Sequence, residues 1–153
     1  MAADAASTAL QAVFGADLVA VVLFGSVLHG RERPDSDVDL LVVLETLPRL
    51  GLRWDHCAPA LEPVETALRI ERPCACLSPL LRTPAEVRHG NPVYYDLTLP
   101  QEREILHDPT GFIAAYLADL AARMAHYGSR RVLDGPAPYW ILAPGHDIRT
   151  VDL

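Results

Sequence analysis

Two continuous apolar runs dominate the hydrophobic pattern in the first third of the chain. Leu18 to Phe24 and Val38 to Leu44 are rich in valine, and their lengths suit strands that are buried on both faces. Gly25 and Ser26 end the first run, and a polar stretch from Arg31 to Ser36 leads into the second. The pattern therefore predicts two core strands that are joined by a turn and a polar loop.

Other segments show the composition or spacing of helices. Ala5 to Phe14 combines strong helix formers, and Ala60 to Arg69 places apolar residues on one stripe. The clearest periodicity predicts a C-terminal helix at about 109–127, followed by a short tail. A further helix is predicted to start in Thr83-Pro84-Ala85-Glu86, where the threonine and the glutamate form a capping box.

The remaining apolar runs predict additional strands. Cys74 to Arg82 is expected to be a third strand, Val93 to Leu99 a fourth, and Glu104 to His107 a short antiparallel partner. Glu45 to His56 has no consistent pattern, because proline and glycine interrupt it. The order of elements predicts one domain over residues 1–153, of mixed α/β or α+β class, with helices packed on a small sheet.

Composition and charge narrow the classes of function. Half of the residues are hydrophobic, and the formal net charge of -7 argues against general nucleic-acid binding. The chain contains no lysine, which excludes a Walker A phosphate loop. No apolar run is long enough to span a membrane and the start of the chain lacks a signal-peptide pattern, so a cytoplasmic location is expected. Cys57, Cys74 and Cys76 are expected to be buried thiols rather than zinc ligands.

The segment between the first two predicted strands carries the candidate chemistry. Alternation along a strand places Asp37 and Asp39 on one face, where the two carboxylates repel each other unless a cation lies between them. Carboxylate oxygens suit Mg²⁺ or Mn²⁺. Gly25 allows close approach of a ligand to the backbone, and Ser26 offers a hydroxyl and an amide at the start of a helical turn. These residues predict a site for a triphosphate and a divalent metal.

The same segment resembles the signature of the polymerase-β nucleotidyltransferase superfamily. It reads Phe24-Gly25-Ser26-Val27-Leu28-His29-Gly30, and then Ser36-Asp37-Val38-Asp39-Leu40. Every fixed position of the pattern Gly-Ser-x-x-x-Gly…Ser-Asp-x-Asp is filled, and the chain is most similar to the small members called minimal nucleotidyltransferases. The specific part of the resemblance covers Leu18 to Leu44.

The resemblance implies a polymerase-β-like fold, in which a mixed sheet has helices on one side. It also implies Mg²⁺ or Mn²⁺ and ATP or another nucleoside triphosphate, with Gly25, Ser26, Ser36, Asp37 and Asp39 binding the nucleotide. A hydroxyl would attack the α-phosphate, and two metals would stabilise the attacking and leaving oxygens. Asp37 and Asp39 would be metal ligands and catalytic residues.

The resemblance further implies a third catalytic and metal-binding carboxylate on a later strand. Asp96 is the candidate, because it lies in a run of apolar and aromatic residues where a lone acid needs an explanation. The alternative is that Asp96 faces solvent or bonds to a neighbouring strand. Glu65 and Glu71 are weaker candidates, since one lies on a predicted helix and the other just beyond it.

Several residues allow two interpretations, one as ligands of the nucleotide and one as ordinary structural or surface residues. His29, Arg31, Arg33 and the pair Arg130-Arg131 are candidate cations for the phosphates, although an ordinary surface position is the simpler interpretation. The aromatic pair Tyr139-Trp140 either stacks on a base or anchors the tail on the core, and anchoring is favoured.

Three hypotheses for the function follow from these residues. The first is transfer of a nucleoside monophosphate, AMP from ATP, to a hydroxyl on a protein partner or small molecule. The resemblance implies that this partner is a helical HEPN-type protein, with the chain acting as its antitoxin. The second hypothesis is a catalytically weak module that binds a nucleotide or a partner. The third is a metal-dependent phosphoesterase or nuclease, against which the acidic charge argues.

Overall fold

The two apolar runs form the central strands of a four-stranded sheet. The computed structural model describes residues 1–30, 33, 35–135 and 137–153, and its main sheet has the order β3-β2-β1-β4. β1 (Leu18–Phe24) pairs antiparallel with β2 (Val38–Leu44) and with β4 (Arg103–His107), whereas β3 (Leu77–Arg82) runs parallel to β2. The prediction of a mixed sheet around the two runs is confirmed.

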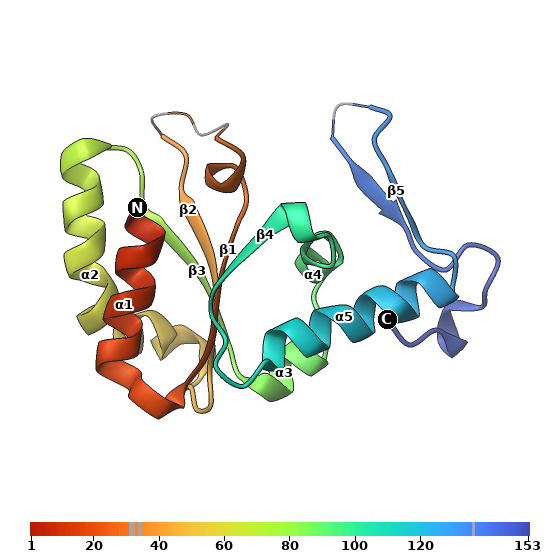
Figure 1. Ribbon diagram of the computed structural model, residues 1–153, viewed down its shortest axis with the longest axis horizontal. Helices are drawn as coiled ribbons and strands as arrows, with labels where there is room; N and C mark the ends of the chain where they lie inside the picture. Colours follow the sequence, from red (N-terminus) through yellow and green to blue (C-terminus); the bar gives the residue numbers. More distant parts are fainter. Residues whose placement is uncertain (31–32, 34, 136) are drawn as a thin grey trace.

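Helices cover both faces of this sheet (Figure 1). One layer consists of α1 (Ala2–Phe14) and α2 (Arg53–Glu71). The other layer consists of α3 (Pro84–Arg88), α4 (Val93–Leu97) and α5 (Phe112–His126). The expectation of helices on one side of the sheet is therefore wrong, although the α+β class is right.

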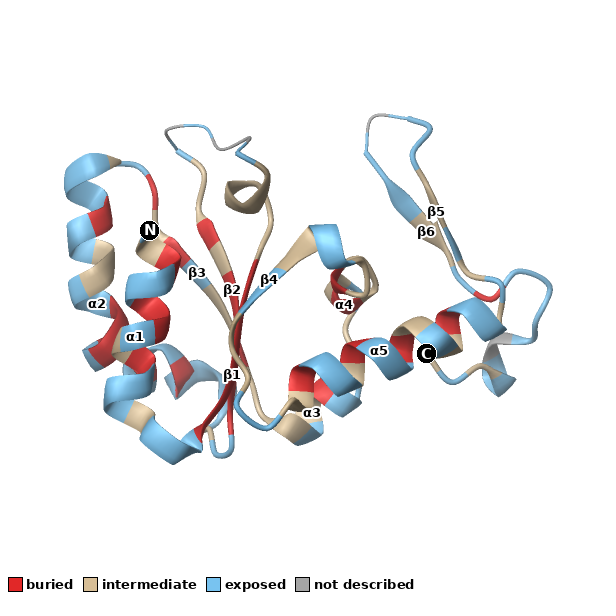
Figure 2. Ribbon diagram, in the orientation of Figure 1, coloured by how far each residue is buried: buried red, intermediate tan, exposed pale blue. Residues whose placement is uncertain are grey.

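The alternation of side chains along β1 explains the two helical layers. Val21 and Leu23 lie in the core beneath α1 and α2, whereas Ala20 and Val22 lie in the core beneath α3 to α5. Figure 2 shows buried residues on the central strands and on helices of both layers. Because both faces of the central strands are apolar, a single layer of helices would leave one face in water.

The predicted helices are confirmed, and one is longer than expected. α1 and α5 match their predicted ranges closely, but α2 begins at Arg53 and passes through Pro59 and Pro63. α3 starts with a complete capping box, since Thr83 Oγ1 accepts from the Glu86 amide at 3.3 Å and Glu86 Oε2 accepts from the Thr83 amide at 2.9 Å. These helices and the capping box could be predicted from the sequence because they depend only on residues that are close together in the chain.

The predicted strand from Val93 to Leu99 is wrong, because this segment forms the short helix α4. Tyr94 and Leu97, three residues apart, are both buried, and the Tyr94 ring packs edge-on against Tyr116 of α5 with centroids 5.8 Å apart. Such a short run fits both a strand and a helix period, and its packing against α5 selects the helix. β4 consequently pairs with β1 and not with residues 93–99.

The tail after α5 forms a two-stranded hairpin. β5 (Arg130–Val132) pairs antiparallel with β6 (Tyr139–Ile141), and the hairpin extends from the end of α5 on the same side of the molecule as the loop between β1 and β2 (Figure 1). Within the described part of the chain, no helix is both long and apolar enough to cross a membrane.

Arg53 joins the start of α2 to β3 and α3. Its buried guanidinium donates to the carbonyl oxygens of Pro48 and Leu81 and to both carboxylate oxygens of Glu86, at 2.6–3.0 Å. The hydrogen bonds from Arg53 lower the pKa of Glu86 from 4.5 to about 2. The stability that this pair provides is therefore complete above about pH 4.5 and is lost as the pH falls toward 2.

Breaking this ion pair should destabilise the fold strongly. Arg53→Met removes the charge and leaves the Glu86 carboxylate and two carbonyl oxygens without their donor, so we expect the free energy of unfolding to fall by about 3 kcal/mol. Urea denaturation measures the change. The control is Arg69→Met, which breaks the pair of the exposed Arg69 with Glu65 on the same helix and should change stability by less than about 1 kcal/mol. Equal losses in the two variants would contradict this account.

Candidate functional site

The two aspartates of the predicted site lie at the end of the sheet where β1 ends and β2 begins. Val38 and Leu40 point into the core beneath α1 and α2, so Asp39 points to the opposite face. Asp39 pairs with Phe24 across the strands, and Gly25 therefore follows directly beside it. Both Asp37 and Asp39 are half-buried. The structure thus brings the Gly-Ser turn and the two carboxylates together, as the sequence predicts.

Each aspartate has a partner on the neighbouring segment that leads into β3. Asp37 Oδ1 accepts from the amide of Cys76 at 3.1 Å and from its thiol at 3.0 Å. Asp39 stands opposite Ser78 of β3 in the parallel register, with the Ser78 hydroxyl on the same face of the sheet. Sequence reasoning missed both partners, although Cys76 and Ser78 alternate on one face of the predicted third strand. Cys76 is half-buried and Cys74 is exposed, so among the three cysteines only Cys57 is the buried core thiol that was expected.

The two carboxyl groups have opposite pKa shifts. Hydrogen bonds from the thiol and the amide of Cys76 lower the pKa of Asp37, with the charge of Arg72 adding to the effect. Burial raises the pKa of Asp39, an effect that the neighbouring Ser78 hydroxyl opposes and the negative charge of Asp37 reinforces. A cation bound between these oxygens would relieve the repulsion that adds to the effect of burial on the pKa of Asp39.

Gly25 is required by the close approach of β1 to the Asp39 side chain. Its φ angle is +81°, in the region that favours glycine, and a Cβ atom at this position would overlap the Asp39 carboxylate. The chain then makes a single 3₁₀ turn over Val27–His29, which ends at Gly30 with a φ angle of +58°. The predicted helical turn after Ser26 is confirmed as this one turn.

Ser36 shapes the loop that leads into Asp37. Its hydroxyl accepts from the Arg33 amide at 2.9 Å, and its amide donates to the Arg33 carbonyl at 3.0 Å. Arg72, just beyond α2, donates to the carbonyl oxygens of Ser36 at 2.5 Å and of Arg33 at 3.0 Å. Arg72 therefore fixes the loop from a distant part of the sequence, and sequence reasoning did not identify it. The candidate cation Arg31 lies outside the described residues.

Asp96 is not brought to Asp37 and Asp39. It lies on α4, where its Oδ1 accepts from Trp140 Nε1 at 3.0 Å and lies 3.1 Å from Arg131 Nε. Across the described ranges, no three His, Cys, Asp or Glu side chains are placed to hold a metal ion together. The geometry of Asp96 is that of an anchor for the tail hairpin, which agrees with the anchoring interpretation of Trp140.

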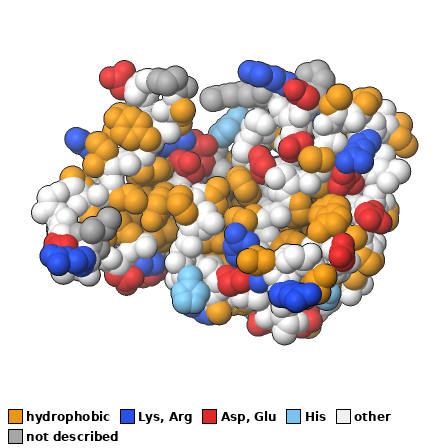
Figure 3. Space-filling model, turned by 180° about the vertical axis from the view of Figure 1, so that it is seen from behind, with side chains coloured by type: hydrophobic (Ala, Val, Ile, Leu, Met, Phe, Trp, Pro, Cys, Tyr) orange, Lys and Arg blue, Asp and Glu red, His pale blue; other side chains and the backbone are white. Residues whose placement is uncertain are grey.

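A chain of polar contacts links this hairpin to the turn after Ser26. His29 Nε2 lies 2.8 Å from Glu102 Oε2, and Glu102 Oε1 accepts from Arg131 Nη1 at 2.7 Å. In the view from behind, acidic side chains and a histidine gather in the hollow between the two projecting parts of the molecule (Figure 3). His29 and Arg131, two candidate phosphate cations, are thus already engaged with Glu102 in this structure.

Removing the Asp96 carboxylate should loosen the hairpin and leave metal-dependent nucleotide binding intact. In Asp96→Ala, Trp140 loses its hydrogen-bond acceptor and Arg131 loses an ion-pair partner, so we expect amide hydrogen exchange in residues 130–141 to become about five- to tenfold faster. Asp119→Ala, which breaks an exposed pair with Arg123 on α5, is the control and should leave this exchange unchanged. Unchanged exchange combined with loss of metal-dependent binding would instead place Asp96 in the metal site.

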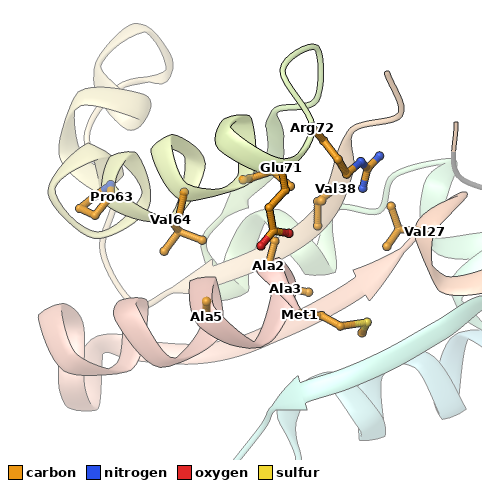
Figure 4. Close-up of a pocket in the computed structure, with 12 residues that line it drawn as sticks. Met1, Ala2, Ala3, Ala5, Val27, Val38, Pro63, Val64, Glu71 and Arg72 are labelled. Carbon is orange, nitrogen blue, oxygen red and sulfur yellow. The ribbon is translucent and has the colours of Figure 1, made fainter. Parts of the chain in front are cut away.

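A separate cavity of about 640 Å³ opens on the other face of the sheet, between α1 and α2 (Figure 4). Its lining is mostly apolar and includes Val27, which follows Ser26, and Val38, which lies between Asp37 and Asp39 in the sequence. Glu71 and Arg72 supply its charged side chains. Neither Asp37 nor Asp39 lines this cavity, so it is distinct from the site of the paired carboxylates.

Comparisons with known proteins agree with this geometry. The model of the nucleotidyltransferase domain family matches residues 6–110. Among curated proteins, none matches the sequence significantly. A toxin–antitoxin complex with AMP-PNP contains a chain of similar fold, with a TM-score of 0.53 and 16% identity over 80% of this chain and 87% of that chain. A mutant of the MntA–HpeT toxin–antitoxin complex has a TM-score of 0.53 and 14% identity over the same shares.

A third structure is that of a tri-AMPylated HEPN toxin from Shewanella oneidensis in complex with its MNT antitoxin. It has a TM-score of 0.45 and 14% identity, over 84% of this chain and 93% of that chain.

Proposed function

Because the chain belongs to the nucleotidyltransferase domain family, we propose that it transfers AMP from ATP to a hydroxyl group of a protein partner. The observation that carries the proposal is the convergence of Gly25, Ser26, Asp37 and Asp39 at one end of the central strands. In the reaction, the acceptor oxygen bonds to the α-phosphorus, the bond to the bridging oxygen breaks, and pyrophosphate leaves. AMP-PNP, an analogue of ATP, accompanies one of the similar structures and supports ATP as the donor.

The donor set at Asp37 and Asp39 fits one divalent cation of the Mg²⁺ or Mn²⁺ class. The two side chains offer hard carboxylate oxygens, the half-buried position strengthens their electrostatic interactions, and solvent and phosphate oxygens would complete the coordination. When bound, the cation supplies charge neutralisation for the phosphates. The low pKa of Asp37 keeps its carboxylate ionised, and Cys76 fixes the orientation of that carboxylate through two hydrogen bonds.

The remaining roles fall to backbone and loop groups. Gly25 allows the chain to pass beside Asp39, and Ser26 presents an amide and a hydroxyl for a phosphate oxygen. Ser36 and Arg72 hold the loop that precedes Asp37. This loop keeps the two carboxylates in a fixed position relative to the turn after Ser26. These contacts are positioning contacts, which matter because phosphoryl transfer depends chiefly on alignment and charge neutralisation.

We propose a HEPN-type toxin as the protein partner, with this chain acting as its antitoxin in the cytoplasm. The two structures with the higher TM-scores are toxin–antitoxin complexes, which supports a toxin as the acceptor.

The test is to incubate the chain with a HEPN-type partner, ATP labelled at the α-phosphate, and Mg²⁺. The proposal predicts that label appears on a hydroxyl side chain of the partner, located by mass spectrometry. The control omits the metal. Label on neither chain, with a partner that is shown to bind, would exclude transfer to this acceptor.

The absence of Asp96 from the pair favours one alternative, a nucleotide-binding module with weak catalysis. Such a module would inhibit its partner by binding alone. It would bind ATP and Mg²⁺ at the same residues, but it would leave the partner unlabelled while still neutralising the toxin. Comparing label with inhibition in one assay therefore separates the two functions.

A further inference from the structure

We propose that Ser78 of β3 occupies the place beside Asp39 where a third carboxylate would complete a second cation site, so that this chain holds one divalent cation with its nucleotide. The inference rests on the proposed function, since it concerns the same nucleotide site. It departs from the arrangement with two metals and three carboxylates that the resemblance implies.

The sheet geometry places Ser78 next to Asp39. β2 and β3 run parallel, with Val38 opposite Leu77 and Asp39 opposite Ser78. Leu77 is buried in the core beneath α1 and α2, so Ser78 points to the opposite face, which is the face of Asp39. Side chains in register on neighbouring strands are within contact distance, so the Ser78 hydroxyl lies beside the Asp39 carboxylate, whose pKa it lowers.

Ser78 is also accessible to a ligand. β3 is an edge strand of the sheet, and Ser78 is exposed. An acidic side chain at this position would therefore reach the same solvent-facing space as Asp39 without having to be buried. The hydroxyl that stands there instead is neutral, and a neutral hydroxyl is a weaker ligand for Mg²⁺ or Mn²⁺ than a carboxylate.

Two of the other acids considered for the site, Asp96 and Glu65, are engaged elsewhere, and the third, Glu71, lines the cavity between α1 and α2 on the opposite face of the sheet. Asp96 is held by Trp140 and Arg131, and Glu102 by His29 and Arg131. Glu65, a weaker candidate, is paired with Arg69 along α2.

Charge then limits the number of cations. Two carboxylates balance one divalent cation, and a second cation would depend on the nucleotide phosphates alone for its negative ligands. Mg²⁺ is usually held by one or two protein carboxylates together with the substrate phosphates. Within the described residues, this site has the carboxylates of Asp37 and Asp39, with the Ser78 hydroxyl and the Cys76 thiol beside them. This set of ligands suits a single divalent cation.

The variant Ser78→Asp tests the inference directly. The matched control is Ser78→Asn, which has a similar size but no charge. We expect equilibrium dialysis at saturating AMP-PNP to find one bound Mn²⁺ per bound nucleotide in the wild type and in Ser78→Asn, and two in Ser78→Asp. Electron paramagnetic resonance should show isolated Mn²⁺ in the first two proteins and a spin-coupled pair in Ser78→Asp. The transfer rate of Ser78→Asp should rise about tenfold.

The outcomes separate this inference from the proposed function. A spin-coupled Mn²⁺ pair in the wild type would overturn the inference while leaving the nucleotide site established. A folded Ser78→Asp variant that holds one Mn²⁺ per nucleotide would overturn it as well. If the wild type binds no AMP-PNP in the presence of Mn²⁺, the proposed function fails first, and the inference fails with it. The number of Mn²⁺ ions that the wild type binds per nucleotide tests the inference even if Ser78→Asp does not fold.

Discussion

Asp39→Asn is expected to abolish AMP transfer, with a rate about 10³-fold below that of the wild type. The substitution keeps the size of the side chain and its place opposite Phe24 and Ser78. It removes one of the two negative charges that would hold the cation, and the remaining carboxylate of Asp37 cannot balance a divalent ion alone. Transfer of labelled AMP to the partner measures the loss.

The matched control for this variant is Asp35→Asn, in the exposed loop before Asp37. It makes the same chemical change two residues away from the pair, and its transfer rate should equal that of the wild type. Circular dichroism should show that both variants are folded. A folded Asp39→Asn protein with wild-type transfer would exclude Asp39 from the reaction.

Gly25→Ala should lower the transfer rate by about 10²-fold or more. The new methyl group would overlap the Asp39 carboxylate, and the backbone would hold an alanine at a φ angle of +81°. Either the carboxylate or the turn must move, and a displacement of about 1 Å from the aligned geometry is enough to reduce a rate by about 10²-fold. Steady-state transfer assays with purified partner measure this effect.

Gly30→Ala separates the clash from the backbone strain. Gly30 also has a positive φ angle, of +58°, but a Cβ atom there meets nothing within 4 Å. Both variants therefore carry backbone strain of about 1 kcal/mol or more, whereas only Gly25→Ala disturbs Asp39. We expect Gly30→Ala to lose some stability and to keep a rate near that of the wild type. Similar losses of activity in the two variants would show that strain in the turn, and not the contact with Asp39, is what matters.

The parts of the site that follow from local sequence could be predicted well. The two valine-rich runs predicted β1 and β2, and the alternation of side chains along a strand predicted that Asp37 and Asp39 share one face. The capping box before α3 was likewise visible, because its two hydrogen bonds join residues three apart. Such features need no knowledge of which distant segments meet.

The parts that depend on distant segments could not be predicted in the same way. The pairing of Ser78 with Asp39 requires the parallel register of β3 on β2, and the contact of Arg72 with the loop at Ser36 spans 36 residues of sequence. The aromatic composition around Asp96 favoured a strand, and the packing of Tyr94 against α5 produced a helix instead. The helix places Asp96 beside Trp140 and Arg131, whereas the role of Asp96 as a third carboxylate stays a prediction.

The central claim is that Gly25, Ser26, Asp37 and Asp39 form a metal-dependent nucleotide site, and calorimetric titration of AMP-PNP tests it most directly. The titration is run with the wild type and with Asp37→Ala, each in the presence of Mg²⁺ and in the presence of a chelator. Our account predicts binding only for the wild type with Mg²⁺. Binding of equal affinity in Asp37→Ala, or in the wild type without metal, would contradict it.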